Sequence, residues 1–314
     1  MRADLDRRAF LATLGALTAA APAWRGVVGQ SASPGTRLIL LGTGGGPRPR
    51  AGRMASAQVV VANNRLYVVD CGDGVARQLV LAGAALPQLA HVFLTHHHSD
   101  HNADYGNLLL LSWASGLAQR VDAYGPPPID RITKLFFEMS ATDIETRIAD
   151  EGRVPLAPLV HVHELTRAGL VMQDDAVKVT CAVVDHPMIK MALAYRFDAA
   201  DRSLVISGDT RRSASLVELA RGADVLVHEA LYLPAVDRLV ARVPNAATLK
   251  AHLLASHTAV EDAARAAAEA GVKTLMLSHL VPADDPLVTD EMWLEAARPH
   301  FSGHIIVARD LMEV

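Results

Sequence analysis

The sequence predicts an α/β protein with two sheets, each covered by helices on its outer face. Three observations support this class. Strand-like segments mix alternating and continuously apolar patterns, and helical segments lie between them. Polar residues follow several apolar strands, as in α/β proteins that build their sites at strand ends. The 314 residues are 51% hydrophobic and 20% charged, which suits a globular soluble protein with a large core.

Short apolar or alternating runs bounded by turn-forming residues predict the strands. In chain order we expect them at 36–41, 58–62, 65–70, 92–95, 120–124, 177–184, 192–197, 203–207, 225–228, 274–277 and 304–308. Asn63-Asn64 is a turn signal between the second and third of these. Helical segments are expected at 75–82, 105–116, 129–146, 258–270 and 291–298. Gly271 marks the end of the fourth helix.

The first 34 residues are predicted to be an export signal and linker. Arg7 and Arg8 precede an Ala/Leu-rich apolar run that is too short to span a bilayer. This pattern resembles a bacterial twin-arginine signal. We therefore expect a periplasmic or secreted protein with one domain over residues 35–314. Removing residues 1–25 leaves 26 basic and 32 acidic residues, so the net charge changes from −4 to −6.

Composition excludes several classes of function. Only Cys71 and Cys181 occur, which rules out a disulfide scaffold, a CxxC redox pair and a cysteine-rich zinc module. Aromatic residues make up 4%, too few for a stacking platform that binds single-stranded nucleic acid. Fourteen histidines, several of them clustered, favour metal chemistry based on imidazole.

The segment from Thr95 to His101 carries the strongest chemical signal. It reads Thr-His-His-His-Ser-Asp-His. His96 and His98 can reach one cation from a turn that leaves a strand, while Asp100 and His101 can reach a second. Nitrogen and carboxylate donors without thiolate suit zinc, and manganese or iron are alternatives. Further ligands available at strand ends are His186, Asp209 and His279.

The His-x-His-x-Asp-His string followed along the chain by His186, Asp209 and His279 resembles the metallo-β-lactamase-fold hydrolases. The resemblance is nearest to the ribonuclease Z and arylsulfatase-type phosphodiesterase branch. The markers of that branch are Leu40-Leu41-Gly42-Thr43-Gly44, Asp70-Cys71-Gly72, Tyr124-Gly125-Pro126, Gly208-Asp209-Thr210-Arg211, His228-Glu229-Ala230 and His257-Thr258. The resemblance implies a four-layer αββα sandwich over about residues 36–310, with a metal site at one edge of the two sheets. It implies two zinc ions, the first held by His96, His98 and His186, the second by Asp100, His101 and His279, with Asp209 bridging them.

Two cations about 3.5–4 Å apart would lower the pKa of a bridging water, so that hydroxide forms near neutral pH. Asp100 is a candidate for both metal ligand and general base. His257 resembles the family's extra histidine, which protonates the leaving group, and Glu229 would orient and charge it. The structural alternatives are a histidine that precedes a helix and a buried carboxylate.

Other candidates are expected to be structural. His97 lies between two ligands and should point away from the metals. The His161-Val162-His163-Glu164 segment imitates a ligand pair but reads as a surface strand. Asp70 is expected to support a metal ligand from behind or to fix a loop near the site, and not to bind metal itself. His228 is expected to be part of the core.

The predicted substrate is a small phosphodiester or sulfate ester. True ribonuclease Z enzymes carry a long arm that grips transfer RNA, whereas Phe197 and Ser207 are separated here by little more than a hairpin turn. The missing arm, the acidic mature domain and the export signal together argue against transfer RNA. We expect no nucleic-acid partner and no membrane contact after signal removal. A homodimer remains open, because dimers are common among the relatives.

Four alternatives remain. An amide or lactone hydrolase, including a β-lactamase, would use the same ligands. Ribonuclease Z-like RNA processing is disfavoured for want of the arm. A di-iron oxidoreductase on this fold would typically have Glu at His98 and a flavin domain. A non-catalytic zinc protein would need no proton donor such as His257.

Overall fold

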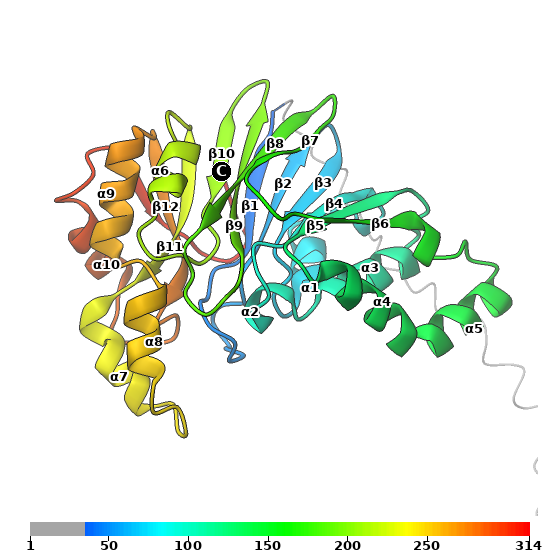
Figure 1. The fold of residues 1–314 in the computed structure, drawn as a ribbon, viewed down its shortest axis with the longest axis horizontal. Coiled ribbons are helices and arrows are strands. Elements are labelled where there is room, and N and C mark those ends of the chain that lie inside the picture. Colours follow the sequence, from blue (N-terminus) through cyan, green and yellow to red (C-terminus); the bar gives the residue numbers. More distant parts are fainter. Residues whose placement is uncertain (1–34) are drawn as a thin grey trace, which may run out of the picture. The chain divides into compact units, whose positions relative to one another are not determined.

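The computed structural model describes residues 35–314. The predicted export signal and linker, residues 1–34, fall outside the described residues. Two seven-stranded sheets stack face to face, and helices cover the outer face of each (Figure 1). This arrangement confirms the predicted α/β class and the four-layer αββα sandwich.

The first sheet has the strand order β14-β1-β2-β3-β4-β5-β6. Its pairs are antiparallel from β14 to β3 and parallel from β3 to β6. Helices α1, α3 and α4 pack on its outer face. The bounds are β14 Met312–Glu313, β1 Arg37–Gly42, β2 Ala57–Ala62, β3 Arg65–Val69, β4 Leu89–Phe93, β5 Val121–Gly125, β6 Val160–Glu164, α1 Val75–Leu81, α3 Tyr105–Ala114 and α4 Ile129–Met139.

The second sheet has the order β13-β12-β11-β10-β9-β8-β7. It is antiparallel from β7 to β10 and parallel from β10 to β13. Helices α6, α9 and α10 cover its outer face. The bounds are β7 Gly169–Gln173, β8 Val177–Val184, β9 Ala192–Ala199, β10 Ser203–Ile206, β11 Val225–Leu231, β12 Thr274–Val281, β13 His304–Val307, α6 Ala214–Leu219, α9 Val260–Ala270 and α10 Asp290–Ala297.

Three apolar layers hold the sandwich together. Strand side chains alternate between faces, so each sheet contributes to the layer between the sheets and to a layer beneath its own helices. Tyr67, Phe93 and Tyr195 are fully buried in the layer between the sheets. On α9, small residues such as Ala263 and Ala267 let the helix lie close to the second sheet.

Helices at the lower edge of Figure 1 differ from the prediction. The expected helix 129–146 is two helices, α4 and α5 (Ala141–Glu151), which share Ser140 as cap. Ser140 leaves helical geometry at φ −95° and ψ 4°, so the helical backbone is interrupted there. Two short helices that were not predicted, α7 (Val236–Ala241) and α8 (Leu249–Ser256), project beside the second sheet (Figure 1).

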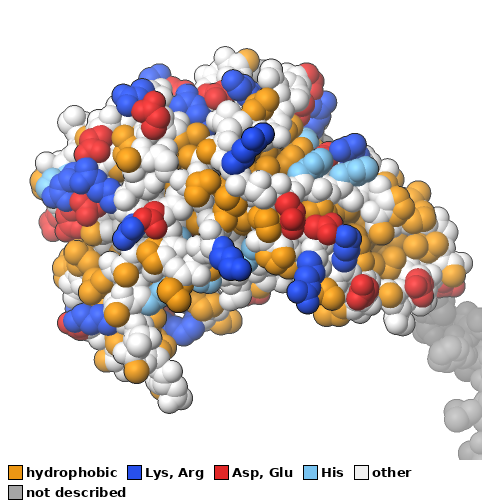
Figure 2. Space-filling model, viewed as in Figure 1, with side chains coloured by type: hydrophobic (Ala, Val, Ile, Leu, Met, Phe, Trp, Pro, Cys, Tyr) orange, Lys and Arg blue, Asp and Glu red, His pale blue; other side chains and the backbone are white. Residues whose placement is uncertain are grey.

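Three further features bear on whether the protein could bind nucleic acid or a membrane. Strands β9 and β10 are joined by a tight hairpin, so no arm emerges there. Acidic and basic side chains are interspersed over the face shown in Figure 2, without a large field of one sign. Among the described residues, no helix is long and apolar enough to cross a bilayer.

Candidate metal centre

The predicted ligands lie where strands of both sheets end. In the first sheet, β4 ends just before His96, and His98 caps the short helix α2 (Ser99–Asn102). In the second sheet, β8 ends before His186 and β10 ends before Asp209. The two sheets thus deliver side chains to one edge of the sandwich, as the sequence predicts.

His279 reaches the same edge through a break in the β11–β12 ladder. Ser278 lies opposite Glu229 and Leu280 lies opposite Ala230, so His279 is an extra residue with no partner in the register. Its φ of 44° is rare for a side chain of this size. A bulge of this kind turns a side chain away from the normal alternation, and here it directs the imidazole toward the other ligands.

The first donor cluster joins three imidazoles and one carboxylate, all largely buried. His98 Nδ1 lies 3.1 Å from His96 Nε2 and 3.2 Å from His186 Nε2. His96 Nε2 lies 3.8 Å from Asp209 Oδ2.

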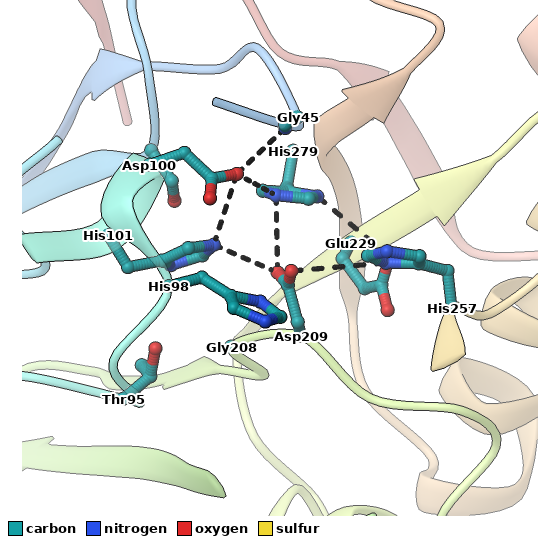
Figure 3. Close-up of polar contacts among 12 residues, drawn as sticks. Gly45, Thr95, His98, Asp100, His101, Gly208, Asp209, Glu229, His257 and His279 are labelled. Carbon is teal, nitrogen blue, oxygen red and sulfur yellow. Dashed lines mark hydrogen bonds and ion pairs between the residues drawn. The ribbon is translucent and has the colours of Figure 1, made fainter. Parts of the chain in front are cut away.

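The second cluster comprises Asp100, His101, Asp209 and His279 (Figure 3). Asp209 Oδ1 lies 3.2 Å from His101 Nε2 and 3.3 Å from His279 Nε2. Asp100 Oδ2 lies 3.2 Å from His279 Nε2 and 3.8 Å from His101 Nε2. Asp209 therefore belongs to both clusters, one oxygen facing each.

These donors fit divalent metal ions. A tetrahedral zinc with bonds of about 2.1 Å places its ligand atoms about 3.4 Å apart, close to the separations in both clusters. His101 Nε2 and Asp209 Oδ1 are also buried without a hydrogen-bond partner, although they lie 3.2 Å apart. Such orphaned atoms are costly unless something else satisfies them, and a cation between them would do so.

Hydrogen bonds to the remaining ring nitrogens orient the ligands. His101 Nδ1 lies 2.7 Å from Asp70 Oδ2, and Asp70 also accepts from the backbone N–H and hydroxyl of Thr95. His186 Nδ1 lies 3.0 Å from the carbonyl oxygen of Ser256. Each contact leaves Nε2 of the histidine facing its cluster, the usual arrangement behind a metal-bound imidazole. Asp70 thus supports a candidate ligand from outside the clusters, as expected.

Electrostatics leave a neutral histidine in the first cluster and an anion at the centre of the site. Burial lowers the pKa of His98 to about 4, and the neighbouring His186 adds to the effect, so His98 is neutral and free to coordinate. Burial alone would raise the pKa of Asp209, but the charges of His101 and His279 hold it well below its usual range. Asp209 is therefore an anion at the centre of the site.

His257 and Glu229 form a pair beside the clusters (Figure 3). His257 Nδ1 lies 2.9 Å from Glu229 Oε2, while Glu229 Oε1 accepts from the backbone N–H of Thr210 and Thr258. Burial lowers the pKa of His257, but the charge and hydrogen bond of Glu229 outweigh burial and raise it to about 9. The pair is thus placed, and charged, as a proton donor would be.

Two glycines give the centre its space. A Cβ on Gly45 would lie 2.7 Å from His279 Nδ1, so only glycine lets the β1–β2 loop approach that ring. Gly208 has φ +60°, and a Cβ there would lie 2.9 Å from Thr95 Cβ. Beyond Gly45, the backbone N–H of Gly46 donates to Asp100 Oδ2 at 2.8 Å.

A cavity of about 290 Å³ opens above the clusters. Candidate ligands, His257, Arg48 and Arg50 line it on several sides. Its remaining wall, which was not predicted, consists of residues from α7, α8 and the segment between them, including His252. The only local signal was the spacing of Leu249, His252 and Leu253 on one helical face.

The histidines predicted to be structural lie outside both clusters. His97 Nε2 contacts the carbonyl oxygen of Pro126 at 2.8 Å and so points away. His163 pairs with Asp122 in β5, and the buried His228 contacts the carbonyl oxygen of Glu229.

Comparison with known proteins now assigns the family. The Beta-lactamase superfamily domain matches residues 65–280. The chain belongs to this superfamily. Solved structures agree with the fold: the metallo-beta-lactamase fold protein YhfI from Bacillus subtilis superposes with a TM-score of 0.67 at 20% identity, covering 89% of this chain and 98% of that one. Human tRNase Z, short form, gives 0.65 at 20% identity, covering 88% and 98%.

Within the superfamily, the similar curated proteins are named Ribonuclease Z, the branch nearest by sequence motifs. The protein of Mycobacterium bovis (strain BCG / Pasteur 1173P2) is 34% identical over 280 residues, covering 88% of this chain and 97% of the relative. That of Mycobacterium sp. (strain KMS) is 35% identical over 279 residues, covering 88% and 95%. The chain is a metal-dependent hydrolase by family, and its His/Asp clusters are where metal ions could bind.

These relatives correct two predictions. The predicted substrate, a small phosphodiester or sulfate ester, is wrong, and so is the expected lack of a nucleic-acid partner. The missing arm does not distinguish this chain from Ribonuclease Z. The alignment has 280 positions and includes about 276 residues of this chain, so only a few positions can be insertions in the relative. The Mycobacterium bovis protein therefore has no arm-sized insertion either. Net charge did not discriminate, because a local cationic site such as Arg48 and Arg50 at the cavity is independent of the total.

Proposed function

We propose that the protein is a metal-dependent endoribonuclease of the ribonuclease Z type, which hydrolyses a phosphodiester bond in RNA. The observation that carries this proposal is the alignment with Mycobacterium bovis Ribonuclease Z, which covers 97% of that relative. The site geometry supports it, because two donor clusters that share a carboxylate are a common arrangement for phosphodiester hydrolysis.

Zinc is the proposed metal, with one ion at each cluster. His96, His98 and His186 would hold the first and Asp100, His101 and His279 the second, with Asp209 shared. When bound, the two ions supply Lewis-acid activation of the phosphodiester and of the attacking water.

The chain's own residues then handle the protons. Asp100, held by the N–H of Gly46, is placed to accept a proton from the attacking water. Because Glu229 engages Nδ1 of His257, Nε2 is left to protonate the leaving oxygen. A bond forms between phosphorus and the water oxygen, and the bond from phosphorus to O3′ breaks. The products are a 3′-hydroxyl and a 5′-phosphate.

The test is cleavage of a labelled precursor transfer RNA with a 3′ extension by zinc-loaded protein. We expect cleavage products with 3′-hydroxyl ends, and loss of more than about 100-fold in rate for Asp209→Ala. Asp143→Ala is the matched control, since Asp143 lies on exposed α5. Two bound zinc ions without RNA cleavage would contradict the substrate, and less than one metal per chain after reconstitution would contradict the chemistry.

A further inference from the structure

The cavity above the clusters has walls of different character. Its floor carries the candidate metal ligands, which are ionic and polar. The wall contributed by α7, α8 and the segment between them is apolar except for one imidazole: Leu239, Val243, Leu249, His252 and Leu253. These leucines and Val243 belong to a small apolar cluster of their own, separate from the three layers of the sandwich.

Helix α8 presents one face to the cavity. Leu249, His252 and Leu253 are spaced i, i+3, i+4 and so lie on the same side of the helix. Leu254 points elsewhere and is 50% exposed. His252 Nδ1 lies 3.3 Å from Ser256 Oγ, which orients the ring within the wall. His252 belongs to neither donor cluster and has no part in the proton transfers.

The position of this wall limits what it can bind. A phosphodiester held at the ionic floor brings its attached groups against the neighbouring leucines. Those leucines offer no hydrogen bonds, so they suit the flat apolar face of a base and not a second phosphate. The volume of about 290 Å³ is near the lower end of small-ligand sites, roughly 300–1,000 Å³, so it admits one nucleotide and excludes a duplex.

We propose that the α7–α8 wall binds the base of one unpaired nucleotide next to the cleaved phosphodiester. The proposal rests on the proposed function, in that the substrate is RNA. Because His252 is the one polar side chain of this wall, contact with the base is largely non-specific in sequence, and larger purine faces are favoured over pyrimidines.

A binding experiment tests the wall without requiring turnover. The zinc-loaded full chain is titrated calorimetrically with adenosine 5′-monophosphate and with ribose 5-phosphate, which lacks the base. We expect the nucleotide to bind about tenfold more tightly, as burial of roughly 55 Å² of apolar surface against the wall would contribute. Adenosine 3′-monophosphate and ribose 3-phosphate represent the other side of the cleaved bond. Equal affinity within both pairs of ligands for the wild-type protein would overturn the proposal.

Variants locate the effect on α8. Leu249→Ala should bring the affinity for the nucleotide to within about threefold of that for ribose 5-phosphate. The affinity for ribose 5-phosphate should stay unchanged, which would show that the floor of the cavity is intact. His252→Ala should weaken only the nucleotide. Leu254→Ala, on another side of the same helix, should change neither. Equal weakening of both ligands by Leu249→Ala and His252→Ala would place the base elsewhere and overturn the proposal.

Cleavage assays separate this proposal from the proposed function. Oligoribonucleotides that lack one base on either side of the cleaved bond should react about tenfold more slowly in one of the two positions. Cleavage that is indifferent to both missing bases would overturn the base site while leaving RNA cleavage standing. Tighter binding of the nucleotide than of ribose 5-phosphate, without any RNA cleavage, would support the base site at the wall and contradict the proposed function.

Discussion

Replacing Gly45 by alanine should disable one half of the metal centre. The new Cβ would lie 2.7 Å from His279 Nδ1 and 2.6 Å from Val281 Cγ2, whereas ordinary contacts begin at about 3.4 Å. Gly45 does not have a positive φ, so alanine is strained only by these contacts. The His279 ring must therefore retreat by about 0.7 Å, more than the roughly 0.5 Å within which a functional site has to be held.

The expected result is a selective loss at the cluster that contains His279. We expect metal affinity there to fall about 10–100-fold and cleavage to fall about 100-fold. Metal content after dialysis against a zinc buffer, together with the cleavage rate, measures both. Gly52→Ala is the matched control, because a Cβ at Gly52 meets nothing within 4 Å. If Gly45→Ala keeps both metals and acts within twofold of wild type, His279 is not a ligand held in this position.

Four further outcomes are expected. His257→Ala should keep its metal and lose about 10²–10⁴ in turnover. In Glu229→Gln, loss of the charge that raises the pKa of His257 to about 9 should move the alkaline decline of kcat to lower pH; an unchanged profile would exclude His257 as the donor. Lys273 and Ser203 lower the pKa of Asp224 from 3.8 to about 2, which stabilises the fold above pH 4 and loses effect as pH falls toward 2. Asp224→Asn should therefore cost about 1 kcal/mol in urea unfolding at pH 7, after allowance for solvent screening, and less at pH 3. For the untested export prediction, lysine at both Arg7 and Arg8 should move the protein from periplasm to cytoplasm on fractionation, and cytoplasmic wild type would disprove it.

Local signals explain which elements could be predicted. Asn63 and Asn64 both have positive φ, 47° and 61°, as a tight hairpin turn between twisted strands requires. Gly271 ends α9 in the left-handed conformation, as expected. Helices α7 and α8 gave no comparable signal, because their apolar residues pack into a small cluster that exists only once the chain has folded.

Local signals likewise explain which residues of the candidate site could be predicted. His96 to His101 could be placed together because they are adjacent in sequence. The approach of His279 to Asp100, 179 positions away, was expected only through resemblance. The role of Gly45 depends on a contact between distant segments that no local pattern encodes. The wall around His252 was indicated only by the spacing of apolar residues on one face of α8. The substrate was predicted wrongly because it was inferred from a missing arm, the net charge and the export signal, and not from the residues that line the site.

Each donor cluster takes ligands from both sheets. His96 and His98 leave the first sheet and meet His186 from the second, so a bound ion acts as a cross-link between the two halves of the sandwich. Binding to the folded form alone adds about 2.7 kcal/mol of stability per ion at a free concentration of 100 Kd. By the same linkage, any core substitution that loosens the contact between the sheets must weaken metal binding. Metal affinity therefore measures how firmly the two sheets are packed together.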